Sequence, residues 1–189
     1  YRNTTVTGIE QQANGEWLVK TDKGDITCEH IVSASGNFVR KTGQMVGLDV
    51  PVTPVEHQYI VTEPIKEFLS REEEMPVMRD PYCSAYYRQE QKSGLIGVYE
   101  TTGSREAWPN KGGQDWDAES ELFPQELDPI MPWLERVMNR VPIFAEAGLM
   151  RIINGAIAHT PDDNPLVGPA PGVRNFWLCC GSSIGIAQG

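Results

Sequence analysis

The sequence predicts a mixed α+β fold, with a largely antiparallel sheet in the middle of the chain and parts of a separate α/β domain at both ends. The N-terminal part alternates apolar and polar residues between turns that contain glycine and asparagine, which is typical of a β-meander. Strand-like segments also outnumber helical ones in the rest of the chain. Two apolar runs, at 31–36 and 175–180, lead into small residues, as strands of α/β domains do at their carboxyl ends.

The elements predicted for the N-terminal part are strands at 4–11, 17–21, 26–28 and 31–36 and a helix at 39–46. Asn14 and Gly15 supply the turn between the first two strands, because asparagine and glycine adopt positive φ angles at low cost. Gly47 is expected to end the helix, since glycine is the favoured residue just past a helix C-terminus. Residues 1–48 are therefore assigned to the first part of the α/β domain.

The elements predicted for the middle are a long strand at 50–62, a charged helix at 65–74, strands at 76–79, 85–90 and 95–99, a surface loop at 101–125 and a helix at 127–140. Two prolines interrupt the long strand. The second helix has apolar residues at Ile130, Leu134, Val137 and Met138, the pattern of an amphipathic helix. Together these elements form the domain assigned to 49–150.

The C-terminal part reads as a strand, a turn, a second strand and a glycine-rich lead into a helix. Its strands are predicted at 150–157 and 175–180, and the glycine-rich segment covers 181–186. Glycines at this junction let bare backbone N–H groups approach a ligand, and a helix N-terminus favours electron-rich groups. Residues 151–189 are therefore assigned to the same α/β domain as residues 1–48.

The composition argues against several classes of partner. The formal net charge of −10 disfavours nucleic acid and anionic membranes, since both select basic surfaces. No apolar run approaches the roughly 18 residues that cross a bilayer, so no membrane is expected as a partner. The four cysteines, Cys28, Cys83, Cys179 and Cys180, include no Cys-x-x-Cys pair and are interpreted as buried, reduced thiols.

His57 and Tyr86 lie on two predicted strands and carry the candidate chemistry. A histidine of near-neutral pKa and a phenol on facing strands can orient an amine substrate and handle its proton. A structural histidine and a core tyrosine are the alternatives. Arg88 and Arg151 are candidate cations for a substrate carboxylate, with structural or surface ion pairing as the favoured interpretation of each. No metal site is expected, because the other two histidines have no partner at ligand spacing.

Five short sequence blocks follow one another along the chain in an order that can be compared with known families. They are Ser33-Ala34-Ser35-Gly36, Pro54-Val55-Glu56-His57-Gln58-Tyr59, Tyr86-Tyr87-Arg88, Asn154-Gly155 and Thr160-Pro161-Asp162-Asp163-Asn164-Pro165-Leu166-Val167-Gly168. In this order the blocks resemble the dimethylglycine and sarcosine dehydrogenase branch of the FAD-dependent D-amino-acid oxidase superfamily. The resemblance covers nearly the whole chain, and it implies that the α/β domain at the two ends binds FAD around a central substrate domain.

By this resemblance, His57 and Tyr86 match the active-site histidine and tyrosine on the substrate side of the flavin ring. The implied FAD contacts are Val6, Ser35, Gly36, Pro165, Leu166, Gly168, Gly181, Ser182, Gly185 and Ile186. The sequence contains no Gly-x-Gly-x-x-Gly, so the strand-turn-helix that grips the FAD pyrophosphate is expected before Tyr1. On this interpretation the chain is part of a longer enzyme, and it binds FAD poorly and is inactive in isolation.

The activity that the resemblance implies is oxidative demethylation of an N-methylated glycine, dimethylglycine or sarcosine, by hydride transfer to flavin. The implied partners are the small N-methylated amino acid and either folate or an electron-transfer flavoprotein. The expected location is the cytoplasm or, in a eukaryote, the mitochondrial matrix. Two alternatives stay open: another amine oxidase of the same superfamily, and a non-catalytic protein like the regulatory subunit of the pyruvate dehydrogenase phosphatase, which resembles this branch.

Overall fold

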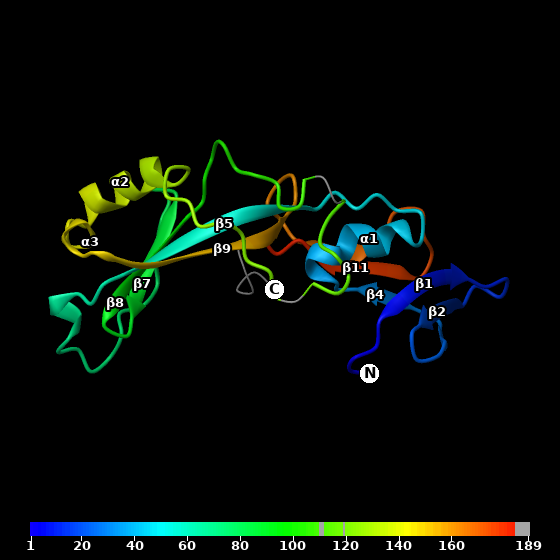
Figure 1. The fold of residues 1–189 in the computed structure, drawn as a ribbon. Helices are drawn as coiled ribbons and strands as arrows, with labels where there is room; N and C mark the ends of the chain where they lie inside the picture. Colours follow the sequence, from blue (N-terminus) through cyan, green and yellow to red (C-terminus); the bar gives the residue numbers. More distant parts are fainter. Residues whose placement is uncertain (110–111, 119, 184–189) are drawn as a thin grey trace. The chain divides into compact units, whose positions relative to one another are not determined.

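The computed structural model describes residues 1–109, 112–118 and 120–183, and the chain divides into two compact units (Figure 1). The first unit comprises Tyr1–Pro54, Glu106–Ala118 and Ile157–Gly189, and the second comprises Val55–Arg105 and Glu119–Ala156. The predicted α+β class is confirmed, because most elements are strands, the sheets are mainly antiparallel and helices are few. The assignment of the predicted domains to cofactor and substrate stays a prediction.

The first unit contains two three-stranded sheets. The antiparallel meander consists of β1 (Val6–Gln11), β2 (Trp17–Thr21) and β3 (Ile26–Cys28), and the other sheet consists of β10 (Leu166–Pro169), β11 (Phe176–Cys180) and β4 (Ile31–Ser33). In the second of these sheets, β11 lies between an antiparallel β10 and a parallel β4. A 3-10 turn, η1 (Gly36–Phe38), leads from β4 into α1 (Val39–Gln44).

The core of the first unit joins both sheets to α1. Trp17 of β2 meets Phe176 of β11 edge to face, with the ring centroids 6.0 Å apart. Val39 at the start of α1 is fully buried in the same cluster. Apolar burial of this kind is the main favourable contribution to folding, so β1–β3, α1 and β11 depend on one another.

The outer face of the β10–β11–β4 sheet is apolar and exposed. Val32, Val167 and Trp177 are 63 %, 73 % and 40 % exposed, respectively. They lie on adjacent strands, because Trp177 pairs with Val32 and Val167 pairs with Cys179. All four cysteines are free thiols, as predicted, but the expectation that all are buried is wrong for Cys179, which is exposed, and Cys28 is only half-buried. Residues of a strand alternate between faces, so Cys180 points to the core and Cys179 to the outer face.

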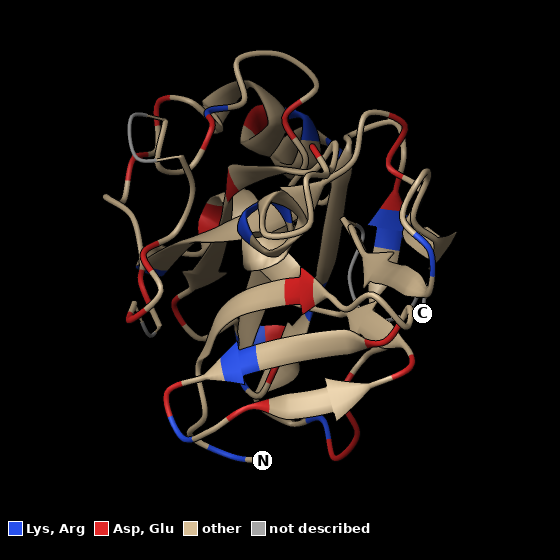
Figure 2. Cartoon of the chain, turned by 90° about the vertical axis from the view of Figure 1, so that its right-hand side faces the viewer, with Lys and Arg blue, Asp and Glu red and all other residues tan. Residues whose placement is uncertain are grey.

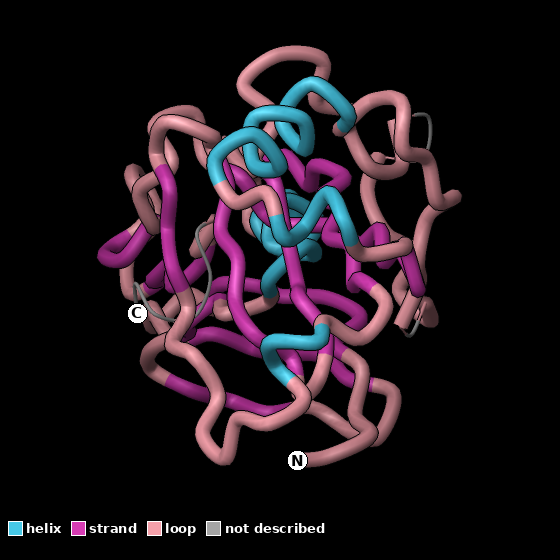
Figure 3. The backbone as a smooth tube through the Cα atoms, turned by 90° about the vertical axis from the view of Figure 1, so that its left-hand side faces the viewer, coloured by secondary structure: helices cyan, strands magenta, loops and turns pink. Residues whose placement is uncertain are grey.

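The second unit is built around a five-stranded sheet. Its strands, in spatial order, are β6 (Met78–Asp80), β7 (Ala85–Glu90), β8 (Ser93–Val98), β5 (Thr53–Thr62) and β9 (Leu149–His159). The helices α2 (Met131–Arg140) and α3 (Ile143–Glu146) cover one face of β7 and β8 (Figure 1, Figure 3). The other face of these strands carries the candidate active-site residues.

The amphipathic pattern predicted for α2 is confirmed. Ile130, Leu134 and Val137 are 0 %, 4 % and 0 % exposed, and they pack in one cluster with Tyr87 of β7 and Ile96 of β8. The helix begins later than predicted, at Met131, with a proline in its first turn. A proline is tolerated there because the first turn has no intrahelical partner for its missing N–H.

Asp80 ties α2 to the edge strand β6. One carboxylate oxygen pairs with Arg140 Nε at 2.7 Å and accepts the Tyr87 hydroxyl at 3.1 Å. The other oxygen accepts the backbone N–H groups of Tyr82 and Cys83 at 3.0 and 3.2 Å. Burial disfavours the charged carboxylate, but the hydrogen bonds from Cys83 and Tyr87 and the charge of Arg140 together hold the pKa of Asp80 below its ordinary value.

The predicted helix at 65–74 is wrong. Only η2 (Lys66–Phe68), a single 3-10 turn, forms in this segment. Residues 71–74 are all charged and offer no apolar stripe for packing. Most helical stability in proteins comes from burial of such a stripe, so the charged residues stay in an irregular loop.

A polar network on β5 and β9 holds the loop that precedes α2. Asn154 of β9 donates from Nδ2 to Glu56 Oε2 at 2.7 Å and to the Pro124 carbonyl at 2.9 Å. Glu56 also pairs with Arg105 at 3.0 Å, and Arg105 pairs with Glu126 at 2.9 Å. The Asn154 side chain therefore links two strands to one loop, while its own buried Oδ1 atom has no hydrogen-bond partner among the residues that the structure describes.

The surface of the described residues matches the acidic composition. The chain has 26 Asp and Glu residues against 16 Lys and Arg residues. Figure 2 shows the acidic positions spread over several loops and strands. In the described ranges, no helix combines the length and the apolar character that crossing a bilayer requires.

We expect Asn154→Ala to lower the free energy of unfolding of the full-length protein by about 1–3 kcal/mol, because Glu56 then loses a buried donor. Asn139→Ala is the matched control: this residue is exposed on α2, and its change should stay within about 0.5 kcal/mol. Urea denaturation measures both variants. Equal stability of wild type and Asn154→Ala would contradict the role given to this network.

Candidate active site and cofactor segments

The face of the second unit's sheet that α2 and α3 do not cover is called the open face. One row of paired residues crosses it. Arg79 of β6 is opposite Tyr86 of β7, Tyr86 is opposite Gly97 of β8, and Gly97 is opposite Tyr59 of β5. Residues directly opposite each other in an antiparallel sheet project to the same face. His57 lies two positions before Tyr59 on β5, so its side chain belongs to this face as well.

The structure brings the two predicted catalytic residues together. The Nε2 atom of His57 lies 3.2 Å from the Tyr86 hydroxyl. Tyr99, just after β8, adds a second phenol: its ring centroid is 4.8 Å from that of His57 and 5.5 Å from that of Tyr86. His57 is only 8 % exposed. The result is a compact aromatic cluster with one imidazole and two phenols.

Gly97 makes the contact between His57 and Tyr86 possible. A Cβ atom built on Gly97 would lie 2.1 Å from Cζ of Tyr86, a distance that no side chain can occupy. The Tyr86 ring therefore lies across β8 in the space that any other residue at position 97 would fill. An aromatic residue that covers a cross-strand glycine is a known way to stabilise a sheet. Here it also carries the phenol from β7 over β8 toward β5.

Tyr86 is a neutral hydroxyl at physiological pH. Burial raises its pKa from the ordinary 10 to about 12, and the neighbouring Tyr99 and Tyr59 add to the shift. The charges of Arg88 and Arg79 act in the opposite direction and are outweighed. Tyr86 can therefore donate or accept a hydrogen bond, but it is a poor base in its own right.

Three of the predicted cofactor segments meet at one edge of the β10–β11–β4 sheet. Strands β4 and β11 are parallel, with Ser33 opposite Leu178, so their carboxyl ends lie at the same edge. Ser35 and Gly36 follow β4, and Gly181 and Ser182 follow β11. Pro165 and Leu166 arrive at this edge too, because Leu166 at the start of β10 pairs with Cys180. Carboxyl ends of parallel strands are where α/β proteins bind ligands.

The side chain of Ser35 is turned toward α1. Its Oγ lies 3.0 Å from Ser33 Oγ and 2.8 Å from Thr42 Oγ1, and the Ser33 and Thr42 oxygens are 2.9 Å apart. These three hydroxyls satisfy one another between β4 and α1. A ligand at this position would therefore meet backbone groups rather than the Ser35 hydroxyl.

The glycines near this edge differ in how much free space surrounds their backbone. Gly36 and Gly168 have φ angles of +54° and +148°, and a Cβ atom on either would meet nothing within 4 Å. Their bare backbone is thus accessible, which fits a cofactor that approaches closely. At Gly181 a Cβ atom would lie 2.5 Å from Thr160 Cγ2, so this glycine is required by the packing of the chain itself. The edge therefore fits the backbone contacts predicted for FAD.

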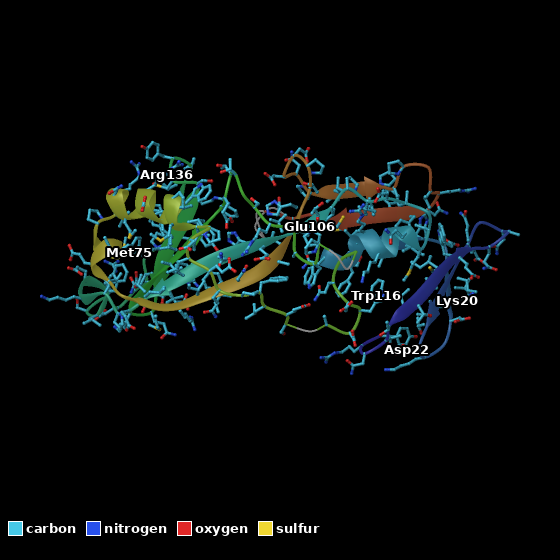
Figure 4. All side chains as sticks on the ribbon, turned by 45° about the horizontal axis from the view of Figure 1, so that its top comes forward. Lys20, Asp22, Met75, Glu106, Trp116 and Arg136 are labelled. Atoms are coloured by element: carbon cyan, nitrogen blue, oxygen red, sulfur yellow. The ribbon has the colours of Figure 1, made fainter. Side chains whose placement is uncertain are left out.

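Other predicted contacts lie elsewhere. Val6 lies in the meander, where it packs against the core of the first unit. Gly185 and Ile186 lie outside the described residues. The segment Glu106–Ala118 belongs to the first unit, where Trp116 (Figure 4) stacks on Phe38 with the ring centroids 5.2 Å apart. The described ranges contain no group of three or more side chains that could bind a metal.

The cations of the second unit have different partners. Arg88 pairs with Glu90 and Glu74, so the favoured interpretation of structural ion pairing is confirmed for it. Arg151 is exposed on β9. Arg79, which sequence reasoning missed, lies with its guanidinium carbon 5.2 Å from the Tyr99 ring centroid. Only the strand register relates it to Tyr86, and the sequence alone does not specify that register.

Comparisons with known proteins agree with the geometry. The family described as FAD dependent oxidoreductase matches residues 1–189. Mitochondrial dimethylglycine dehydrogenase of Homo sapiens is 38 % identical over 184 residues, which cover 96 % of this chain and 21 % of that protein. Mitochondrial sarcosine dehydrogenase of Mus musculus is 31 % identical over 198 residues, with 99 % and 20 % covered. The chain thus spans about a fifth of the length of these relatives.

Solved structures show the same fold. The crystal structure of glycine oxidase from Geobacillus kaustophilus superposes with a TM-score of 0.65 at 21 % identity and covers 97 % of this chain and 44 % of that one. At this identity the likeness concerns the fold alone.

Gly97→Ala should displace Tyr86, because the added methyl group and the phenol ring compete for one space. We expect the free energy of unfolding of the full-length protein to fall by about 1–3 kcal/mol. Adding Tyr86→Ala should restore part of that loss, since the clash disappears. Gly8→Ala on β1 is the control, because its Cβ atom would make an ordinary contact at 3.7 Å with Lys20. Simple additivity of the Gly97 and Tyr86 substitutions would refute the steric argument.

The raised pKa of Tyr86 predicts a pH window of instability. The unfolded chain releases this proton near pH 10 and the folded chain only near pH 12, so folding stability should decline as the pH rises from about 10 to about 12. Unfolding free energies of wild type and Tyr86→Phe between pH 7 and 12 measure this. The difference between the two proteins should be constant up to pH 9 and change above pH 10; a constant difference throughout would contradict the buried phenol.

Proposed function

Because the chain belongs to the family of FAD-dependent oxidoreductases, we propose that it is part of an enzyme that oxidatively demethylates an N-methylated glycine, either dimethylglycine or sarcosine. The observation that carries this proposal is the 3.2 Å contact between His57 Nε2 and the Tyr86 hydroxyl on the sheet face that α2 and α3 leave uncovered. Two relatives above 30 % identity are named dehydrogenases of these two amines, which supports the choice of substrate.

FAD, when bound, supplies the acceptor for the hydride equivalent of the substrate C–H bond. The backbone at Gly36 and Gly168 would hold it, since these two positions leave bare main chain open to a ligand. The role of the protein is then to place the substrate and to control its proton.

Hydride loss requires a free lone pair on the substrate nitrogen, so the substrate ammonium must first lose a proton. His57 is the proposed acceptor. Its Nε2 atom can take the proton in the tautomer that carries hydrogen on Nδ1. The neutral Tyr86 hydroxyl, 3.2 Å from Nε2, is the proposed hydrogen-bonding group that orients the amine. The aromatic walls at Tyr86 and Tyr99 exclude water from this proton transfer and give the methyl groups an apolar surface.

The proposed partners follow from the same reasoning. The substrate is a small N-methylated amino acid. Loss of the hydride leaves an iminium carbon, which water releases as formaldehyde together with the demethylated amine, or which folate captures as a one-carbon unit. An electron-transfer flavoprotein is the proposed electron acceptor. The mitochondrial names of the relatives support a matrix location in a eukaryote. In a prokaryote the proposed location is the cytoplasm.

His57→Ala in the full-length enzyme should lower kcat by about 10²–10⁴-fold, which is the usual contribution of a general base. The FAD content per protein should stay at the wild-type level, because His57 lies on the substrate-facing sheet. His30→Ala is the control: this histidine is exposed between β3 and β4, outside the predicted catalytic and cofactor segments, and its variant should retain wild-type turnover.

Stopped-flow reduction of the flavin by dimethylglycine and the flavin absorbance of the purified variants provide the two measurements. Unchanged turnover in His57→Ala would remove His57 from the mechanism. A wild-type flavin that no N-methylglycine bleaches would favour a regulatory protein of the same fold.

A further inference from the structure

We infer that Arg79 recognises the carboxylate of the substrate, and that the enzyme therefore selects amino acids over neutral methylamines. The inference rests on the proposed function and adds to it the residue that determines substrate class. Neither cation proposed from the sequence, Arg88 or Arg151, has the surroundings that Arg79 has.

The placement of Arg79 follows from the strand register. It is directly opposite Tyr86 on the neighbouring strand, and both side chains project to the open face of the sheet. Its guanidinium carbon lies 5.2 Å from the centroid of the Tyr99 ring, within the range of a cation–π contact. Tyr99 also stacks on His57 at 4.8 Å, so one aromatic ring is the common neighbour of the cation and of the proposed base.

Arg79 is available to an anion. Within the described part of the chain, it has no carboxylate at ion-pair distance, whereas Arg88 is paired with Glu90 and Glu74. The next residue, Asp80, does not compete, because strand alternation directs its carboxylate to the opposite face, where Arg140 and Tyr87 engage it. The five N–H donors of the Arg79 guanidinium are thus left for a ligand.

The chemistry of an N-methylglycine fits this arrangement. A single carbon separates its amine nitrogen from its carboxylate, so the two groups must be bound by neighbouring side chains. A guanidinium can hold a carboxylate with two parallel hydrogen bonds, which fixes orientation as well as position. With the carboxylate on Arg79, the amine is directed toward the Tyr86 hydroxyl and His57, where the proposed mechanism needs it.

The test uses the full-length FAD-loaded enzyme and two substrates that differ only at the anionic end. These are N,N-dimethylglycine and N,N-dimethylethanolamine, in which a hydroxymethyl group replaces the carboxylate. Arg79→Gln should raise the KM for dimethylglycine by about 10- to 100-fold, the range expected for loss of a charge-assisted hydrogen bond. The kcat/KM for dimethylethanolamine should be the same in wild type and variant. Arg79→Lys should recover part of the loss.

Binding without turnover gives a second readout. Methoxyacetate keeps the carboxylate and cannot lose a hydride from an amine, and its dissociation constant follows from the change in flavin absorbance. This constant should rise 10- to 100-fold in Arg79→Gln. Arg136→Gln is the matched control, since Arg136 is exposed on α2 (Figure 4), which covers the opposite face of the sheet.

The outcomes separate this inference from the proposed function. Wild-type values for dimethylglycine and methoxyacetate in Arg79→Gln would overturn the inference and leave the amine oxidation standing. A rise in the KM for dimethylglycine that appears only in Arg88→Gln or Arg151→Gln would overturn the inference in the same way. A wild-type enzyme that binds methoxyacetate through Arg79 but oxidises neither amine would overturn the proposed function and leave the anion site standing.

Discussion

The missing side chain at Gly97 is the constraint on which the candidate active site depends. Tyr86 starts from β7 and must pass over β8 to reach His57 on β5, and only a glycine leaves the necessary space. The ring that fills this space is desolvated, which keeps its phenol protonated and able to donate. A steric property of one position thereby decides both the geometry and the protonation state of its cross-strand neighbour.

The two faces of the same sheet have different roles. The face under α2 and α3 is apolar and contains the largest share of the second unit's core. The open face carries the groups of the candidate site: the imidazole of His57, three phenols and the guanidinium of Arg79. Successive side chains of β7 point to opposite faces of the sheet. Tyr87 therefore packs under the helices, while Tyr86 lies in the candidate active site. On β6, Asp80 likewise points to the helix-covered face, where it binds Tyr87, and Arg79 points to the open face, where it contacts Tyr99.

Much of this could be read from the sequence, for reasons visible in particular residues. The strands β2, β3 and β7 have the predicted bounds, because turns or charged residues flank their alternating patterns. Periodicity also placed the buried face of α2 correctly. The meeting of His57 with Tyr86, 29 positions apart, was anticipated through a resemblance in motif order, which carries information about tertiary contacts that composition does not. Gly97 and Arg79 escaped notice because their importance arises only from register. The helix predicted at 65–74 does not form, because its helix-forming residues lack an apolar stripe that could pack against the rest of the protein.

The bare outer face of the β10–β11–β4 sheet has a practical consequence. A patch centred on Trp177, with Val32 and Val167 beside it, attracts any complementary apolar surface, including that of another copy. Sulfate and similar salts strengthen such adhesion, whereas low concentrations of urea weaken it. Precipitation with ammonium sulfate would therefore favour aggregation of any preparation in which this patch stays uncovered. Purification at low ionic strength would reduce that aggregation.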